Sequence, residues 1–150
     1  MSGPSPRRAT EDDLDGINRL VVAAFGKYVE RIGKPPAPMT ADYAELLRTS
    51  RVWVIEHERE VVGVLVTQVQ PDHLLLDSIA VTPTAQGAGH GHTLLERADQ
   101  DARELGLPEI RLCTNEAMSE NIEFYPRRGF HETGRGIQDG YHRVFFAKAL

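Results

Sequence analysis

The chain has 150 residues, of which 41% are hydrophobic and 26% are charged, the balance of one ordinary globular domain. Its single cysteine, Cys113, excludes an internal disulfide framework and a zinc site built from several thiolates. The net charge of −5 disfavours nucleic acid and anionic membranes as partners. Neither a signal-peptide core nor a membrane-spanning apolar run is evident. We therefore expect one domain over residues 1-150 in a soluble, cytoplasmic protein.

The first third of the chain predicts an edge strand, two helices and a stiff connection. Residues 7–9 suit a short edge strand, and Thr10 followed by Asp13 has the pattern of a capping box that opens a helix. Three prolines within residues 32–38 predict a loop rather than a helix. Thr40 is expected to cap a second helix that runs to about residue 48.

The middle of the chain changes to the period of strands. Residues 52–55 and 61–69 are rich in β-branched side chains and predict a hairpin that turns at residues 58–60. A third strand is expected over residues 74–81, and Pro83 ends it. These strands are predicted to be antiparallel neighbours.

The last half of the chain alternates helices and strands. A glycine-rich turn at residues 87–91 leads into a helix predicted over residues 93–105, and residues 110–114 form a strand that the crossover places parallel to residues 74–81. A short helix is expected over residues 118–128, and strands at 130–133 and 144–148. The pattern predicts a mixed α/β (α+β) fold with a mostly antiparallel sheet.

The turn after the third strand carries the clearest chemical signal. Backbone N–H groups at a helix start are unpaired and the helix dipole is positive there, so the turn is suited to phosphate oxygens. Glycines allow a ligand to approach the backbone closely. An anion, such as a pyrophosphate, is therefore expected along the turn, whose residues are Gln86, Gly87, Ala88, Gly89, His90 and Gly91.

Two common nucleotide motifs do not fit this turn. A P-loop needs a lysine and a hydroxyl residue after its glycines, whereas Gly91 is followed by His92 and Thr93. A dinucleotide fingerprint needs a third glycine where His92 stands, and it belongs on a first strand rather than after a hairpin. A dinucleotide-binding oxidoreductase remains an alternative that NAD(P)H binding would support.

The ordered series of motifs resembles the GNAT superfamily of acetyl-CoA-dependent N-acetyltransferases. It comprises Leu76–Pro83 before the turn, Gln-x-x-Gly-x-Gly within it, Leu94-Leu95 after it, and Tyr125-x-x-x-Gly129-Phe130 downstream. The resemblance covers nearly the whole chain. It implies a GNAT-like sheet in which one parallel pair of strands splays apart, with helices on both faces.

The resemblance also implies how acetyl-CoA is held, with no metal. The Gln86–Gly91 turn is expected to hold the pyrophosphate, and pantetheine is expected to bond like an extra strand to the backbone of Ile79, Ala80 and Val81. A backbone N–H near Val81 is expected to face the oxyanion of the tetrahedral intermediate. His90 and His92 have no carboxylate or cysteine at metal-ligand spacing.

Tyr125 and Asp77 are the candidate catalytic residues. The resemblance makes Tyr125 the group that protonates or hydrogen-bonds the departing thiolate, and its alternative is simple packing beside Phe124. Asp77 alternates with Ile79 and Val81 along its strand, so it is expected to face the cleft as the base for the amine. The alternative is that Asp77 satisfies backbone or cationic groups.

Further contacts to the coenzyme are expected from Asn121 and Arg128. Many family members have an asparagine seven residues before the tyrosine, but Met118 stands there, and Asn121 or Asn115 is the replacement. Arg128 is placed to reach a phosphate, or it serves only as a partner of the helix dipole.

The acceptor is expected between the loops at residues 34–39 and 134–141, with Tyr28 and Tyr141 in its pocket. The expected reaction is direct attack of a primary amine on acetyl-CoA in a ternary complex. The sequence does not choose among a polyamine, an amino acid, an aminoglycoside-like molecule and a protein amine, and it leaves a homodimer open. The alternative function is a non-catalytic acyl-CoA-binding sensor or interaction module, which would bind acetyl-CoA without turnover.

Overall fold

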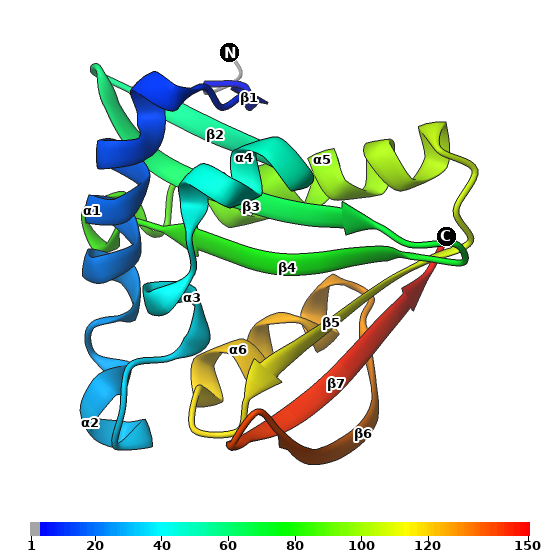
Figure 1. Cartoon of the computed structure of the whole chain (residues 1–150). Helices are drawn as coiled ribbons and strands as arrows, with labels where there is room; N and C mark the ends of the chain where they lie inside the picture. Colours follow the sequence, from blue (N-terminus) through cyan, green and yellow to red (C-terminus); the bar gives the residue numbers. More distant parts are fainter. Residues whose placement is uncertain (1–3) are drawn as a thin grey trace.

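The computed structural model describes residues 4–150 and has a seven-stranded sheet at its centre (Figure 1). The strand order is β1-β2-β3-β4-β5-β7-β6, and among the strands of the described residues only β4 and β5 pair in parallel. The expected mixed α/β fold with a mostly antiparallel sheet is therefore confirmed. The strands are β1 Arg7–Arg8, β2 Arg51–His57, β3 Glu60–Val69, β4 Leu74–Val81, β5 Glu109–Asn115, β6 His131–Gln138 and β7 Tyr141–Ala149.

Helices cover both faces of this sheet (Figure 1). In the described part of the chain, none of them combines the length and the apolar character that crossing a membrane requires. The α-helices are α1 Leu14–Phe25, α2 Tyr28–Ile32, α3 Ala37–Thr40, α4 Tyr43–Thr49, α5 His90–Glu104 and α6 Ser119–Phe124, and the short 3₁₀ turns are η1 Glu11–Asp13, η2 Pro83–Ala85 and η3 Pro126–Arg128.

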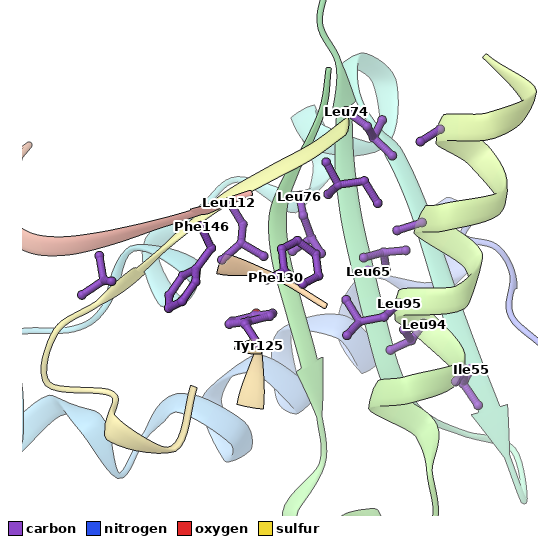
Figure 2. Packing of buried hydrophobic residues seen from close by; sticks show 14 of the residues in the cluster. Ile55, Leu65, Leu74, Leu76, Leu94, Leu95, Leu112, Tyr125, Phe130 and Phe146 are labelled. Carbon is purple, nitrogen blue, oxygen red and sulfur yellow. The ribbon is translucent and has the colours of Figure 1, made fainter. Parts of the chain in front are cut away.

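Each face of the sheet has its own hydrophobic core, because successive side chains of a strand point to opposite faces. On one face α1 and α4 pack on β2 and β3, with Ile17, Val54 and Val64 fully buried. On the other face, Leu94 and Leu95 of α5 point toward the sheet beside Leu65 (Figure 2). The two cores hold the sheet rigid between the helices.

The first third of the chain departs from prediction at its proline-rich segment. The predicted end of the loop over residues 32–38 is wrong, because Ala37–Thr40 forms the helical turn α3. Pro38 is tolerated there because it lies in the first turn of the helix. Thr40 does not cap the next helix. Asp42 does so, since its Oδ1 accepts a hydrogen bond from the N–H of Glu45 at 3.2 Å.

Two helices in the second half begin or end away from the predicted positions. Helix α5 begins at His90, three residues earlier than expected, because Gly89 takes the left-handed conformation and serves as its N-cap. The helix expected over residues 118–128 ends at Phe124 and is followed by η3, since Pro126 cannot continue the hydrogen-bond ladder. Helix α2 was not predicted.

The parallel strands β4 and β5 are paired only at their beginnings. Leu74 pairs with Ile110 and Leu75 with Arg111, and beyond these residues the strands diverge (Figure 1). On its other side β4 stays paired with β3, where Thr67 faces Leu76 and Val66 faces Ser78. Asp77 is therefore the extra residue of a β-bulge, which bends and twists a strand. The expected splayed pair is confirmed.

Candidate active site

The divergence of β4 and β5 opens a pocket of about 520 Å³, a size typical of small-molecule sites. Its walls come from β4, from β5, from the start of β7 and from the segment that contains α3. The polar or titratable residues on these walls include Tyr43, Asp77, Ser78, Cys113, Asn115, Asn121, Tyr125, Tyr141 and Arg143. Both predicted catalytic residues thus line one pocket.

Asp77 lines this pocket at the position of the bulge. The bulge interrupts the regular alternation on which the prediction for Asp77 rested, because it places an extra residue between Leu76 and Ser78. Ile79 and Val81 pack against the core under α5, whereas Ala80 belongs to the opposite core. The bulge leaves Asp77 on the wall of the pocket.

The electrostatic setting of Asp77 suits a base. Asp77 is an exposed residue by surface area, but the protein atoms packed around its carboxyl group partly desolvate it and raise its pKa, and the positive charge of Arg143 offsets part of this rise. Within the described residues 4–150, no group forms a hydrogen bond or a salt bridge with the carboxylate of Asp77. The alternative that Asp77 only satisfies structural partners therefore has no such contact to support it.

Arg143 is the pocket residue that the sequence analysis missed. The register of β7 against β6 and β5 sets it opposite Gly136 on one side and Asn115 on the other. Its Nη1 donates to Cys113 Sγ at 3.2 Å, a weak acceptor. Arg143 stands two residues after Tyr141 in β7, so the two side chains share one face of the strand. Because the sequence analysis did select Tyr141, this spacing could have identified Arg143 as well.

Tyr125 lies at the floor of the pocket and is 4% exposed. Its ring packs edge-on against Phe124 at a centroid distance of 5.2 Å. Figure 2 shows it beside Phe130 and Phe146, whose ring centroids lie 5.6 and 5.8 Å away. Burial raises the pKa of the Tyr125 hydroxyl, and nearby Cys113 and Tyr28 add to the rise. The phenol therefore stays protonated at neutral pH. Tyr125 therefore packs beside Phe124, as the alternative to a catalytic role requires, and it also borders the pocket.

The two predicted acceptor loops lie together at the mouth of the pocket. Tyr141 donates its hydroxyl to the carbonyl of Pro35 at 2.7 Å, and Lys34 Nζ donates to the carbonyl of Gly140 at 3.0 Å. From the other side, the hydroxyl of Tyr43 donates to the carbonyl of Pro38 at 2.7 Å. The proline-rich segment is thus fixed at both ends as one wall.

Tyr28 does not join Tyr141 on the pocket. Its ring is buried in the core beneath α1 and is covered by Lys27 and Arg31, which lie 5.0 and 5.1 Å from its centroid. Burial raises the pKa of its hydroxyl. The residues that line the pocket include Tyr43 and Tyr141 but not Tyr28.

The glycine-rich turn lies outside this pocket, on an exposed surface at the start of α5. Gly87 and Gly89 have φ angles of +92° and +84°, and a Cβ at either position would meet no atom of residues 4–150 within 4 Å. The turn therefore keeps open space above its backbone. The side chain of Gln86 folds back, where its Nε2 donates to the carbonyl of Val81 at 3.2 Å.

The start of α5 is linked to Arg128 through one aromatic ring. His90 is buried, so its side chain does not extend from the turn into solvent. A Cβ on Gly91 would lie 3.3 Å from Phe124 Cζ, which shows how closely the helix start packs on that ring. The guanidinium of Arg128 stacks 3.8 Å from the centroid of Phe124. Arg128 and the turn thus border a common surface.

Asn121 and Asn115 both line the pocket, in different roles. Asn121 Nδ2 donates to Thr114 Oγ1 at 3.1 Å and approaches Met118 Sδ at 3.4 Å, which ties α6 to β5. Asn115 Oδ1 accepts from the backbone N–H of Ala117 at 2.9 Å and shapes the turn before α6.

Within the described part of the chain, the backbone of β4 beyond Leu75 has no partner strand on its β5 side. Ile79, Ala80 and Val81 lie on this open edge, where an extended ligand can bond as an added strand. Within the described residues, no group of three or more His, Cys, Asp or Glu side chains gathers in a way that would hold a metal ion.

The comparisons with known proteins agree with this arrangement. Residues 17–130 match the model of the Acetyltransferase (GNAT) family. The chain is 32% identical over 133 residues to the amino-acid acetyltransferase of Mycobacterium tuberculosis, an alignment that covers 86% of this chain and 69% of that protein. The chain belongs to the GNAT acetyltransferase family and is an acyltransferase.

Solved structures show the same fold. A GCN5-related N-acetyltransferase from Rhodopseudomonas palustris has a TM-score of 0.83 at 20% identity, covering 100% of this chain and 98% of that one. A Bacillus subtilis acetyltransferase in complex with CoA has a TM-score of 0.74 at 19% identity, covering 99% of each chain. Acetyl-CoA is accordingly the co-substrate of the family to which this chain belongs.

Proposed function

We propose that residues 1-150 form an N-acetyltransferase domain that moves the acetyl group of acetyl-CoA to a primary amine by direct attack in a ternary complex. One observation carries the proposal. Asp77 and Tyr125 border the same pocket at the point where β4 and β5 diverge, so a base and a hydrogen-bond donor lie on one site. Direct transfer needs both groups near one reacting carbonyl.

The coenzyme is proposed to lie along the open edge of β4. The turn from Gln86 to Gly91 would take the pyrophosphate on its backbone N–H groups, with Arg128 as a further cation on the same surface. The backbone of Ile79, Ala80 and Val81 would bond pantetheine. Asn121 would border the pantetheine arm from the opposite wall.

Asp77 is proposed to remove the proton that an ammonium group must lose before it can attack. Because its pKa is raised toward neutral pH, the carboxylate of Asp77 is a stronger base than that of an ordinary aspartate. The nitrogen then forms a bond to the thioester carbon. The oxyanion is stabilised by a backbone N–H near Val81. Collapse of the intermediate breaks the carbon–sulfur bond, and the nitrogen releases its second proton to solvent to give the amide.

Tyr125 is proposed to stabilise the departing thiolate by a hydrogen bond rather than by giving up its proton. An unperturbed phenol has a pKa near 10 and a thiol one near 8.5, so full transfer would cost about 2 kcal/mol. Burial raises the pKa of Tyr125 and increases this cost. The neutral hydroxyl stays a donor, and CoA takes its proton from solvent.

The test is thiol release from acetyl-CoA against a panel of primary amines, with acetyl-CoA binding measured separately by calorimetry. The panel includes amino acids, because the Mycobacterium tuberculosis relative bears the name of an amino-acid acetyltransferase. It also includes polyamines, aminoglycosides and a peptide amine. Turnover on at least one amine is expected. Saturable binding of acetyl-CoA with no turnover on any amine would favour a binding module and reject the proposal.

A further inference from the structure

The pocket holds two opposite charges that lack ionic partners. Arg143 makes no salt bridge with a residue in the described span 4–150, and its one side-chain hydrogen bond is to the thiol of Cys113. The charge of Arg143 acts to lower the pKa of Asp77, but the two side chains lie beyond salt-bridge distance of each other. The other arginine on the pocket wall, Arg111, differs, because it is paired with Glu109 at 2.9 Å and with Asp72 at 3.4 Å.

On β6 the register partner of Arg143 is Gly136, so no side chain stands directly opposite Arg143 on that strand. A guanidinium has five N–H donors in a planar fork, and the thiol of Cys113 accepts weakly from one of them. The guanidinium also lies 5.4 Å from the ring centroid of Tyr141, a cation–π contact that is not a hydrogen bond. Donors of Arg143 therefore remain for a ligand of the pocket.

Ser78 adds a second polar group at the same site. Its side chain lines the pocket, it is 7% exposed, and its buried Oγ lies near the hydroxyl of Tyr43 without meeting strict hydrogen-bond geometry to any described residue. Because the Tyr43 hydroxyl donates its own proton to Pro38, the Ser78 hydroxyl can donate either to the Tyr43 oxygen or to a polar ligand in the pocket. Ser78 directly follows Asp77, so this ligand lies beside the carboxylate.

We propose that the acceptor carries a carboxylate next to its amino group, and that Arg143 binds this carboxylate while Asp77 receives the ammonium end. The inference rests on the proposed function and names the substrate class of its site. The two charges of an α-amino acid are opposite in sign, so a single acceptor can offer Asp77 and Arg143 one partner each. A planar fork is the geometry that binds a carboxylate with two parallel hydrogen bonds.

A polyamine or aminoglycoside is a poorer match for this pocket. Such acceptors carry several positive charges, and a second ammonium would meet the unpaired guanidinium of Arg143 instead of an acid. An acceptor with one amine and one carboxylate leaves neither charge of the pocket unpaired.

The experiment compares matched acceptors in the thiol-release assay. Each of the common amino acids is measured beside its carboxamide and its decarboxylated amine, which keep the amino group and remove the negative charge. The wild-type protein is expected to prefer the amino acid by about tenfold to a hundredfold in kcat/KM, the size of one charged hydrogen-bonding interaction. Equal rates for an amino acid and its amide would overturn the inference while leaving the acetyltransferase proposal intact.

Variants of Arg143 locate the effect. Arg143→Gln is expected to raise KM for the amino acid at least about tenfold, to leave KM for acetyl-CoA unchanged and to abolish the preference over the amide. Arg143→Lys keeps the charge but not the fork, so an intermediate KM is expected. Arg135→Gln is the matched control, because this exposed arginine of β6 is paired with Glu132 and Glu116 outside the pocket. A preference that survives in Arg143→Gln would also overturn the inference.

Calorimetry separates the failure of this inference from failure of the proposed function. Amino acids are titrated into the protein with CoA present, and a thermal melt checks that each variant is folded. Binding that depends on Arg143 without any turnover would sustain the carboxylate site and reject the transferase. Turnover on other amines, with no binding of amino acids, would do the reverse.

Discussion

The glycine-rich turn gives the sharpest test of where CoA binds. Gly89 has a φ of +84° at the N-cap of α5, and Gly106 has a φ of +71° just beyond the end of that helix. Among the residues that the structure describes, no atom lies within 4 Å of a Cβ built at either position. Glutamate at either glycine thus meets the same backbone strain and no clash, which makes Gly106→Glu a matched control for Gly89→Glu.

The expected magnitudes follow from this geometry. A side chain in the left-handed region costs about 1–2 kcal/mol, so both variants should lower the melting temperature by about 2–8 °C. Only Gly89→Glu sets a negative charge beside the proposed pyrophosphate site. Repulsion between unit charges 4 Å apart is about 1 kcal/mol in water and about 4 kcal/mol near a protein surface, which weakens CoA binding by about fivefold to a thousandfold.

The assay is calorimetric titration of CoA into both variants, after thermal melts have confirmed similar stability. Gly106→Glu is expected to bind CoA like the wild type. Equal CoA affinities in Gly89→Glu and Gly106→Glu would show that the turn does not hold the pyrophosphate. A selective loss in Gly89→Glu supports the placement.

Three further predictions concern other residues. Tyr125→Phe keeps the aromatic packing, so it should lower kcat about tenfold to a hundredfold while CoA affinity and stability change little; unchanged turnover would refute the thiolate role. Asp77→Asn should lower kcat/KM by about 10²–10⁴-fold. In the wild type, activity should fall as pH drops through the raised pKa of Asp77, above its ordinary 3.8, and a limb that persists in Asp77→Asn would assign it to another group. Asp13→Asn removes a carboxylate whose pKa is lowered by Arg7, so its contribution to stability is present above the ordinary pKa and is lost as pH falls below it. Urea unfolding at neutral pH should show that the free energy of unfolding falls by about 1–3 kcal/mol in the variant, and this difference should shrink in acid. Equal unfolding midpoints at pH 7 would contradict the prediction.

The local elements of this protein follow from its sequence because their causes are local. The β-branched runs of β2 and β3, the strand β4 up to Pro83 and the glycines before α5 each specify a structure within a few residues. The capping pattern of Thr10 and Asp13 is also present, with the Thr10 N–H donating to Asp13 Oδ2 at 2.8 Å. The motif order around Gln86–Gly91 and Tyr125 was enough to indicate the family.

The active-site geometry depends on the tertiary structure. The register between β3 and β4 makes Asp77 a bulge, and no pattern within residues 74–81 reveals a register. Arg143 enters the pocket because β7 pairs with β5. Its register partner on β5 is Asn115, which lies 28 residues earlier in the chain. Tyr28 and Tyr141 look alike in the sequence, yet packing buries one and sets the other at the pocket. Residue types and local periods are encoded along the chain, whereas the meeting of distant side chains is decided by how strands pair and cores pack.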